Sequence, residues 1–208
     1  PLQRGDVVWT REPHACHLPE RMQADVAYRI ATMENITPNV LKQIEVLSTG
    51  PLAESFAAAD RTPPVYDPAT CSVTMPEDFK ASFQALMDSG FWSLDLPHHL
   101  GGAGAPPSLR WAGAEMMLGG NPAAFMYMSG PGFAAILDHL GNDAQKKIAE
   151  IMIERQWGAT MVLTEPDAGS DVGAGRTKAI DNGDGTWRIE GVQRFITSAE
   201  HDMTENIV

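Results

Sequence analysis

The chain has 208 residues, with 27 acidic and 15 basic side chains, which gives a formal net charge of −12 at pH 7. This acidic balance argues against nucleic acids and anionic membrane surfaces as partners, because both attract a basic protein face. The content of 43% hydrophobic and 20% charged residues is typical of a folded globular chain, and no apolar run is long enough to predict a membrane span.

Residues 1–22 follow no helical or strand pattern, and we expect them to form an irregular leader. They include His14, Cys16 and His17, three residues of types that ligate metals. A zinc site would need a second such cluster at a suitable spacing, so we predict no metal site. The two cysteines, Cys16 and Cys71, are too few for a disulfide framework, and we expect reduced thiols in a cytoplasmic protein.

Between residues 23 and 156 the apolar residues recur every three to four positions, which predicts a helical domain. Gly50-Pro51 is expected to interrupt an early helix, since proline cannot donate the helical hydrogen bond. Asn121 and Asn142 are expected to cap two later helices. The chain also has 11 methionines, which indicate adaptable packing, either around a bulky ligand or in an ordinary core.

The pattern changes at Trp157, where we predict the start of an antiparallel β domain over residues 157–208. Residues 157–164 are expected to form a buried strand, and residues 192–198 an extended segment. Between them, residues 181–185 (DNGDG) predict a hairpin turn. These few strands would leave open sheet edges, so we expect either that the sequence is a fragment or that a second chain completes the sheet.

The most unusual stretch is residues 164–171 (TEPDAGSD), where small and hydroxyl residues follow a predicted strand. Such a loop exposes backbone N–H groups, so it is either a ligand-binding loop or a structural turn. Ser170 is not predicted to be a hydrolase nucleophile, because it lacks the GxSxG context and a nearby histidine.

Two segments of this region resemble the signatures of the acyl-CoA dehydrogenase family. Residues 161–171 (MVLTEPDAGSD) with residues 175–179 (GRTKA) are similar to the middle-domain signature of that family. Residues 189–198 (IEGVQRFITS) resemble its second signature, at the usual separation. Two signatures in the correct order make the resemblance specific.

Two segments further upstream are also similar to this family. Residues 90–102 (GFWSLDLPHHLGG) resemble a turn of its N-terminal domain, where an acidic residue more often precedes the two glycines. Residues 140–147 (LGNDAQKK) resemble the start of the last helix of that domain. The resemblance covers residues 23–208, and the long segment before Pro76 is most similar to a large, long-chain-type branch found in actinobacteria.

The resemblance implies an α+β fold. In it a helical N-terminal domain is followed by an incomplete antiparallel β-barrel domain, and the C-terminal helical domain of the family is absent from this chain. It also implies FAD as the cofactor. Residues Met161, Val162, Leu163 and Thr164 would meet the edge of the isoalloxazine ring, where hydrogen bonds stabilise the negative charge of the reduced flavin.

The second signature would supply the rest of the flavin wall. By the same resemblance Phe195 would pack on the ring, where the family often has tryptophan, with Ile196 beside it, and Thr197 would present its hydroxyl near N5. Ser170 matches a position that contacts the pantetheine arm of the substrate, and we count it with the cofactor site. From the residues alone, the favoured interpretation of Phe195 is an ordinary core aromatic, and that of Thr197 is an ordinary strand threonine.

The implied reaction needs a carboxylate base that removes the α proton of the thioester. The family supplies this glutamate from its C-terminal domain, and no residue here matches that motif. Glu165 belongs to the loop scaffold in the family rather than to the catalytic groups. We therefore expect no catalytic residue in this chain and no catalysis by the chain alone.

The resemblance implies an enzyme of fatty acid β-oxidation that converts fatty acyl-CoA to trans-2-enoyl-CoA and passes electrons to an electron-transferring flavoprotein. The expected assembly is a homodimer or tetramer, or a complex with a companion chain that carries the C-terminal helical domain. Two alternatives stay open. One is an acyl-CoA oxidase-like enzyme of the same fold, and the other is a non-catalytic binding or scaffold subunit.

Overall fold

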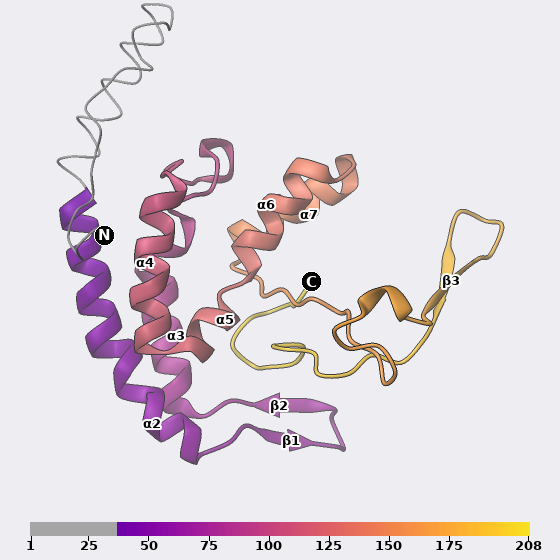
Figure 1. Ribbon diagram of the computed structural model, residues 1–208, viewed down its shortest axis with the longest axis horizontal. Coiled ribbons are helices and arrows are strands. Elements are labelled where there is room, and N and C mark those ends of the chain that lie inside the picture. Colours follow the sequence, from indigo (N-terminus) through magenta and orange to yellow (C-terminus); the bar gives the residue numbers. More distant parts are fainter. Residues whose placement is uncertain (1–36) are drawn as a thin grey trace, which may run out of the picture. The chain divides into compact units, whose positions relative to one another are not determined.

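The computed structural model describes residues 37–208 (Figure 1). The predicted leader at residues 1–22, with its His14, Cys16 and His17, therefore lies outside the described residues, as does the start of the helical pattern at residue 23. The chain divides into two compact units after Gln43.

The early helix is interrupted at Gly50-Pro51, as the sequence predicts. Residues 37–47 are α-helical and are followed by a π-helical turn, η2 (Ser48–Leu52), and then by α2 (Ala53–Arg61). Because Pro51 has no N–H, one helical hydrogen bond is missing, and the wider turn accommodates the proline without ending the helical path.

A short hairpin separates α2 from the next helix. Strands β1 (Val65–Asp67) and β2 (Ser72–Thr74) pair antiparallel. Helix α3 (Glu77–Asp88) follows, with two acidic side chains in its first turn, where the helix dipole favours negative charge. It buries Phe79, Phe83 and Leu86 and packs against α2 and η2.

Four more helices complete the helical region: α4 (Pro107–Gly120), α5 (Pro122–Tyr127), α6 (Gly130–Leu140) and α7 (Asp143–Glu154). The predicted caps are confirmed, since Asn121 accepts the N–H of Ala124 and Asn142 that of Gln145. Helices α6 and α7 pack on each other around a small core. The buried residues of that core are Ala134, Ala149, Met152 and Ala159.

The β region is less regular than the sequence predicts. Strands β3 (Lys178–Asp181) and β4 (Trp187–Glu190) form an antiparallel hairpin around the predicted turn. Residues 157–164 and 192–198, predicted as strand and extended segment, lie outside regular strands, and a single parallel bridge joins Gly158 to Ile207. A strand needs a backbone partner along its length, and within residues 37–208 these segments are paired only in places.

A helical region followed by an incomplete β region agrees with the predicted α+β fold. Within the described residues both sheets have two strands, and no closed barrel forms. The predicted domain boundary at residue 156 stays a prediction. No helix among residues 37–208 has the length and apolar character needed to cross a membrane.

Candidate functional site

The two segments predicted to contact the flavin lie side by side. The N–H of Arg194 donates to the carbonyl oxygen of Thr164 at 2.8 Å. The hydroxyl of Thr160 donates to the carbonyl oxygen of Thr197 at 2.6 Å. Since Thr160 is opposite Thr197 and Thr164 opposite Arg194, the two segments run antiparallel. Residues 161–164 and 195–197 are therefore neighbours, as a shared wall requires.

These neighbouring segments expose an unusual amount of apolar surface. Met161, Val162 and Leu163 are 49–56% exposed, and Phe195 is 86% exposed. Phe195 also has a φ of +58°, a left-handed conformation that is uncommon for a bulky residue and is often found at functional sites. An aromatic ring held away from the backbone in this way can pack on a flat ligand.

The remaining predicted site residues differ in their environment. Thr164 and Ile196 are half-buried, and Thr197 is exposed. Ser170 is exposed on the loop after Thr164, and within residues 37–208 its hydroxyl makes no hydrogen bond. The structure thus brings the predicted flavin residues of the two segments together and leaves Ser170 outside this hydrogen-bonded pairing.

Glu165 holds the loop behind this wall. The residue is 9% exposed, and its carboxylate accepts the backbone N–H groups of Arg176 at 2.6 Å and Thr177 at 2.9 Å, and the side-chain amide of Gln193 at 3.3 Å. Hydrogen bonds from the Thr177 hydroxyl and these backbone groups lower the pKa of Glu165 to about 2. A carboxylate stabilised this strongly in its charged form is a poor base, so the geometry favours a scaffold role.

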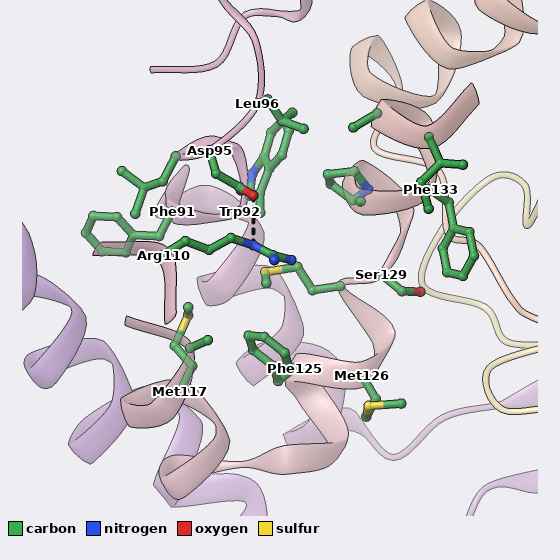
Figure 2. Close-up of a pocket in the computed structure, with 17 residues that line it drawn as sticks. Phe91, Trp92, Asp95, Leu96, Arg110, Met117, Phe125, Met126, Ser129 and Phe133 are labelled. Atoms are coloured by element: carbon green, nitrogen blue, oxygen red, sulfur yellow. Dashed lines mark ion pairs between the residues drawn. The ribbon is translucent and has the colours of Figure 1, made fainter. Parts of the chain in front are cut away.

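A pocket of about 460 Å³ opens among α4, α5, α6 and the loop before α4 (Figure 2). Its walls are mostly apolar, and three of its residues are methionines. Sequence reasoning missed this pocket, although the many methionines were consistent with packing around a bulky ligand. Its side chains include Trp92, Met117, Phe125, Met126, Met128 and Phe133.

Polar groups stand at two places in the pocket wall. Arg110 Nε lies 2.8 Å from Asp95 Oδ2, and both side chains are partly buried (Figure 2). Ser129 donates its hydroxyl to the carbonyl oxygen of Ala159 at 2.7 Å. Ala159 lies two residues before Met161, so this hydrogen bond connects the pocket wall to the predicted flavin segment.

The two histidines of the loop before α4 have structural partners, one within the loop and one on α6. His98 Nδ1 lies 2.9 Å from the carbonyl oxygen of Gly102, and His99 Nε2 lies 2.8 Å from Asp138 Oδ2. Among the residues that the structure describes, no group of three histidine, cysteine, aspartate or glutamate side chains could hold a metal ion.

Known proteins are similar to most of this chain. It is 53% identical over 170 residues to the broad-specificity linear acyl-CoA dehydrogenase FadE5 of Mycobacterium tuberculosis. The aligned region covers 81% of this chain and 28% of that protein. The chain is 38% identical over 141 residues to 3-methylmercaptopropionyl-CoA dehydrogenase of Ruegeria pomeroyi. That aligned region covers 65% of this chain and 24% of the relative. The chain thus spans about a quarter of the length of these relatives.

A solved structure supports the fold. Butyryl-CoA dehydrogenase from Megasphaera elsdenii superimposes with a TM-score of 0.60 at 23% identity, over 78% of this chain and 40% of that one. A family model for the FliG middle domain matches residues 16–49, a short stretch that lies mostly outside the described residues.

Proposed function

We propose that this chain, which belongs to the acyl-CoA dehydrogenase family, supplies the helical and flavin-facing parts of an enzyme that oxidises fatty acyl-CoA to trans-2-enoyl-CoA. The observation that carries the proposal is the antiparallel pairing of residues 160–164 with residues 194–197. This pairing gathers an exposed apolar surface and two threonine hydroxyls on adjoining segments.

This surface fits an isoalloxazine ring. The exposed side chains of Met161, Val162, Leu163 and Phe195 offer apolar contact area for a flat aromatic group. In the proposed complex Phe195 would pack on the ring, and the hydroxyls of Thr164 and Thr197 would donate hydrogen bonds to it. When bound, FAD accepts the hydride that leaves the β carbon of the acyl thioester.

The pocket described above is the proposed place for the acyl chain. Its volume of about 460 Å³ lies within the range of small-molecule sites, and its walls are mainly aromatic and methionine side chains. Unbranched methionines adapt to ligands of different shape, so this wall fits substrates of varied chain length. The Ser129–Ala159 hydrogen bond brings the pocket close to the segment that carries Met161.

The catalytic base of the proposed reaction lies outside this chain. Glu165 is committed to its hydrogen bonds, and its low pKa leaves it ionised and weakly basic. The base would come from a C-terminal helical domain, on the same polypeptide or on a companion chain, in a cytoplasmic dimer or tetramer. Ser170 would contact the pantetheine arm, and an electron-transferring flavoprotein would take up the electrons.

The complete enzyme that carries this chain provides the test. Anaerobic addition of a fatty acyl-CoA should bleach the flavin absorption, and electron-transferring flavoprotein should restore it. Fast recovery in air with release of peroxide would instead support the acyl-CoA oxidase alternative. A protein that carries no flavin and does not react would support the scaffold alternative and refute the proposal.

Single substitutions test the flavin wall itself. Thr197→Val removes one proposed hydrogen bond, and we expect the affinity for FAD to fall about five-fold. Thr74→Val, on the exposed face of β2, is the matched control and should leave the affinity unchanged. Equal affinities in the two variants would contradict the assigned role of Thr197.

A further inference from the structure

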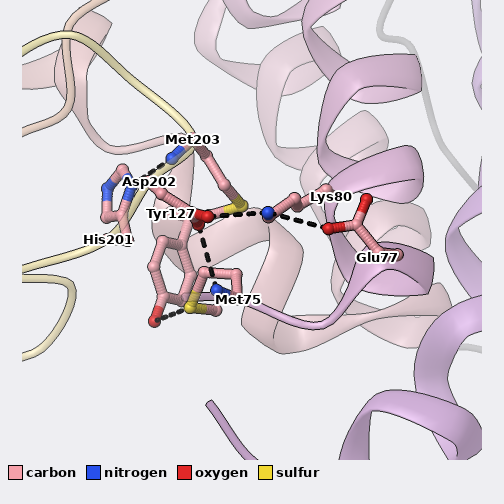
Figure 3. Close-up of polar contacts among 7 residues, drawn as sticks. All are labelled: Met75, Glu77, Lys80, Tyr127, His201, Asp202 and Met203. Atoms are coloured by element: carbon pink, nitrogen blue, oxygen red, sulfur yellow. Dashed lines mark hydrogen bonds and ion pairs between the residues drawn. The ribbon is translucent and has the colours of Figure 1, made fainter. Parts of the chain in front are cut away.

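Asp202 joins the segment after Thr197 to the helical region (Figure 3). Its Oδ1 accepts the backbone N–H of Met75 at 3.0 Å, and its Oδ2 lies 2.6 Å from Lys80 Nζ. Lys80 also pairs with Glu77 at 2.9 Å. The two carboxylate oxygens of Asp202 therefore bind one group just before α3 and one in its first turns, 122 or more residues earlier in the chain.

His201 is buried next to this ion pair. It is 4% exposed, and its ring meets that of Tyr127 edge to face, with 5.1 Å between centroids (Figure 3). Nδ1 accepts the N–H of Met203 at 3.2 Å, which places the proton of the neutral ring on Nε2. Within the described residues Nε2 has no hydrogen-bond partner, and it packs against Gly158.

A protonated ring fits this site poorly. An imidazolium donates from both nitrogens, so its Nδ1–H would face the Met203 N–H, and its Nε2–H would stay without an acceptor. Burial lowers the pKa of His201, and the nearby charges of Glu200 and Asp202 oppose this effect only in part. The other facing groups are the phenol of Tyr127, from α5, and the uncharged backbone around Gly158.

The same segment is attached on its other side to the predicted flavin segment. The N–H of Gly158 donates to the carbonyl of Asn206, and the N–H of Thr160 donates to that of Val208. The carbonyl of Thr197 accepts the Thr160 hydroxyl. Residues 198–208 therefore connect Thr197 to the helices. His201 and Asp202 supply the contacts to α5 and α3, and Glu205 pairs with Arg155, at the end of α7, at 3.1 Å.

We propose that His201 and Asp202 form a proton-sensitive latch that fastens the segment after Thr197 to the helices, with Asp202 as its positioning residue. The latch is closed while His201 is neutral and opens as the ring takes up a proton. The role of the latch in positioning Thr197 rests on the proposed function. The contacts that form the latch do not involve a flavin.

The direction of the pH effect follows from the burial of His201. Its ordinary pKa is 6.5 and its folded value is lower, so the closed latch has its full stability above pH 6.5 and loses stability as the pH falls below that value. At pH 5.5, one unit below 6.5, protonation of His201 in the open form raises the equilibrium constant for opening by up to about ten-fold.

Hydrogen exchange of the flavin-free chain tests the latch. We expect amides of residues 198–208 to lose protection by up to about ten-fold between pH 7.5 and pH 5.5, after correction for intrinsic exchange rates. His201→Phe keeps a ring beside Tyr127 but cannot titrate, so this pH dependence should disappear. His139→Phe, at an exposed position on α6, should retain it. Identical pH dependence in His201→Phe and the unaltered chain would overturn the proposal.

A second set of variants tests the positioning role. In the complete enzyme Asp202→Asn should alter the visible spectrum of the bound flavin, and Asp202→Glu should restore it in part. Asp60→Asn, an exposed change on α2, should leave the spectrum unaltered. An unaltered spectrum in Asp202→Asn would overturn the positioning role. An enzyme that binds no flavin would refute the proposed function, and the exchange result on the flavin-free chain would still decide whether the latch exists.

Discussion

The carboxylate of Glu165 accepts the backbone N–H of Thr177 at 2.9 Å, across a loop of eleven intervening residues. The same carboxylate accepts the N–H of Arg176 at 2.6 Å and the Gln193 amide at 3.3 Å. One charged group thus ties the predicted signature loop to the segment that leads to Phe195. Its contacts explain why an acidic residue stands here although it has no catalytic assignment.

Stability should depend on pH through Glu165. Its pKa is about 2 in the folded chain against an ordinary 4.5, so its contribution is present above pH 4.5 and is lost as the pH falls from 4.5 towards 2. Glu165→Gln should lower the melting temperature by several degrees at pH 7, because the new amide would face two N–H donors. It should also flatten the stability profile in that pH window.

Urea denaturation between pH 7 and pH 3 provides the measurement, with Glu154→Gln as the control. Glu154 undergoes the same chemical change on an exposed position of α7. If Glu165→Gln kept the acid sensitivity of the unaltered chain, the assignment of this carboxylate to the loop would be wrong.

The elements that depend on local chemistry could be predicted from the sequence. The caps at Asn121 and Asn142 are confirmed because a side chain reaches backbone groups only three residues ahead. The turn at residues 181–185 and the break at Pro51 are equally local, since they rest on turn residues and on a missing N–H.

Features that depend on distant partners could not be predicted from the sequence. Residues 157–164 have the composition of a buried strand, yet Met161, Val162 and Leu163 are exposed because no strand covers them within the described residues. The pocket and the Met75–Asp202 contact join residues far apart in the chain, which no local pattern reveals. The pairing of the segment that holds Thr164 with the segment that holds Thr197 was expected only because of the family resemblance.

The two asparagine caps should differ in what they contribute to stability. Asn121 is 1% exposed and also donates to the carbonyl of Leu52 at 3.2 Å and to the Ser55 hydroxyl at 3.0 Å, whereas Asn142 caps an exposed helix end. Asn121→Ala should therefore lower the free energy of unfolding by about 2–4 kcal/mol, since it removes the cap and leaves buried groups unpaired. Asn142→Ala should cost about 1 kcal/mol. Equal shifts of the urea midpoint would contradict this ranking.

Two glycines of α6 should respond in opposite ways to the same substitution. A Cβ atom at Gly130 would overlap the carbonyl oxygen of Trp157, whereas a Cβ atom at Gly132 would meet open space. We expect Gly130→Ala to destabilise by about 1–3 kcal/mol through overpacking and Gly132→Ala to stabilise by about 0.5–1 kcal/mol through helix propensity. Thermal melts of both variants give the comparison, and a gain in melting temperature for Gly130→Ala would show that this helix does not sit against Trp157.

The open space at Gly132 also provides a test of the proposed acyl pocket. Gly132 lines the pocket, so a leucine side chain there would fill part of it. In the complete enzyme Gly132→Leu should raise the KM for long acyl chains about ten-fold or more, with a smaller effect on short ones, because the filled volume excludes the distal methylenes. Gly119→Leu is the control, because Gly119 lies on the exposed surface of α4 with equally open space around it. This variant should leave the KM unchanged for both long and short acyl chains. A uniform rise in KM for all chain lengths in Gly132→Leu would place the acyl chain elsewhere.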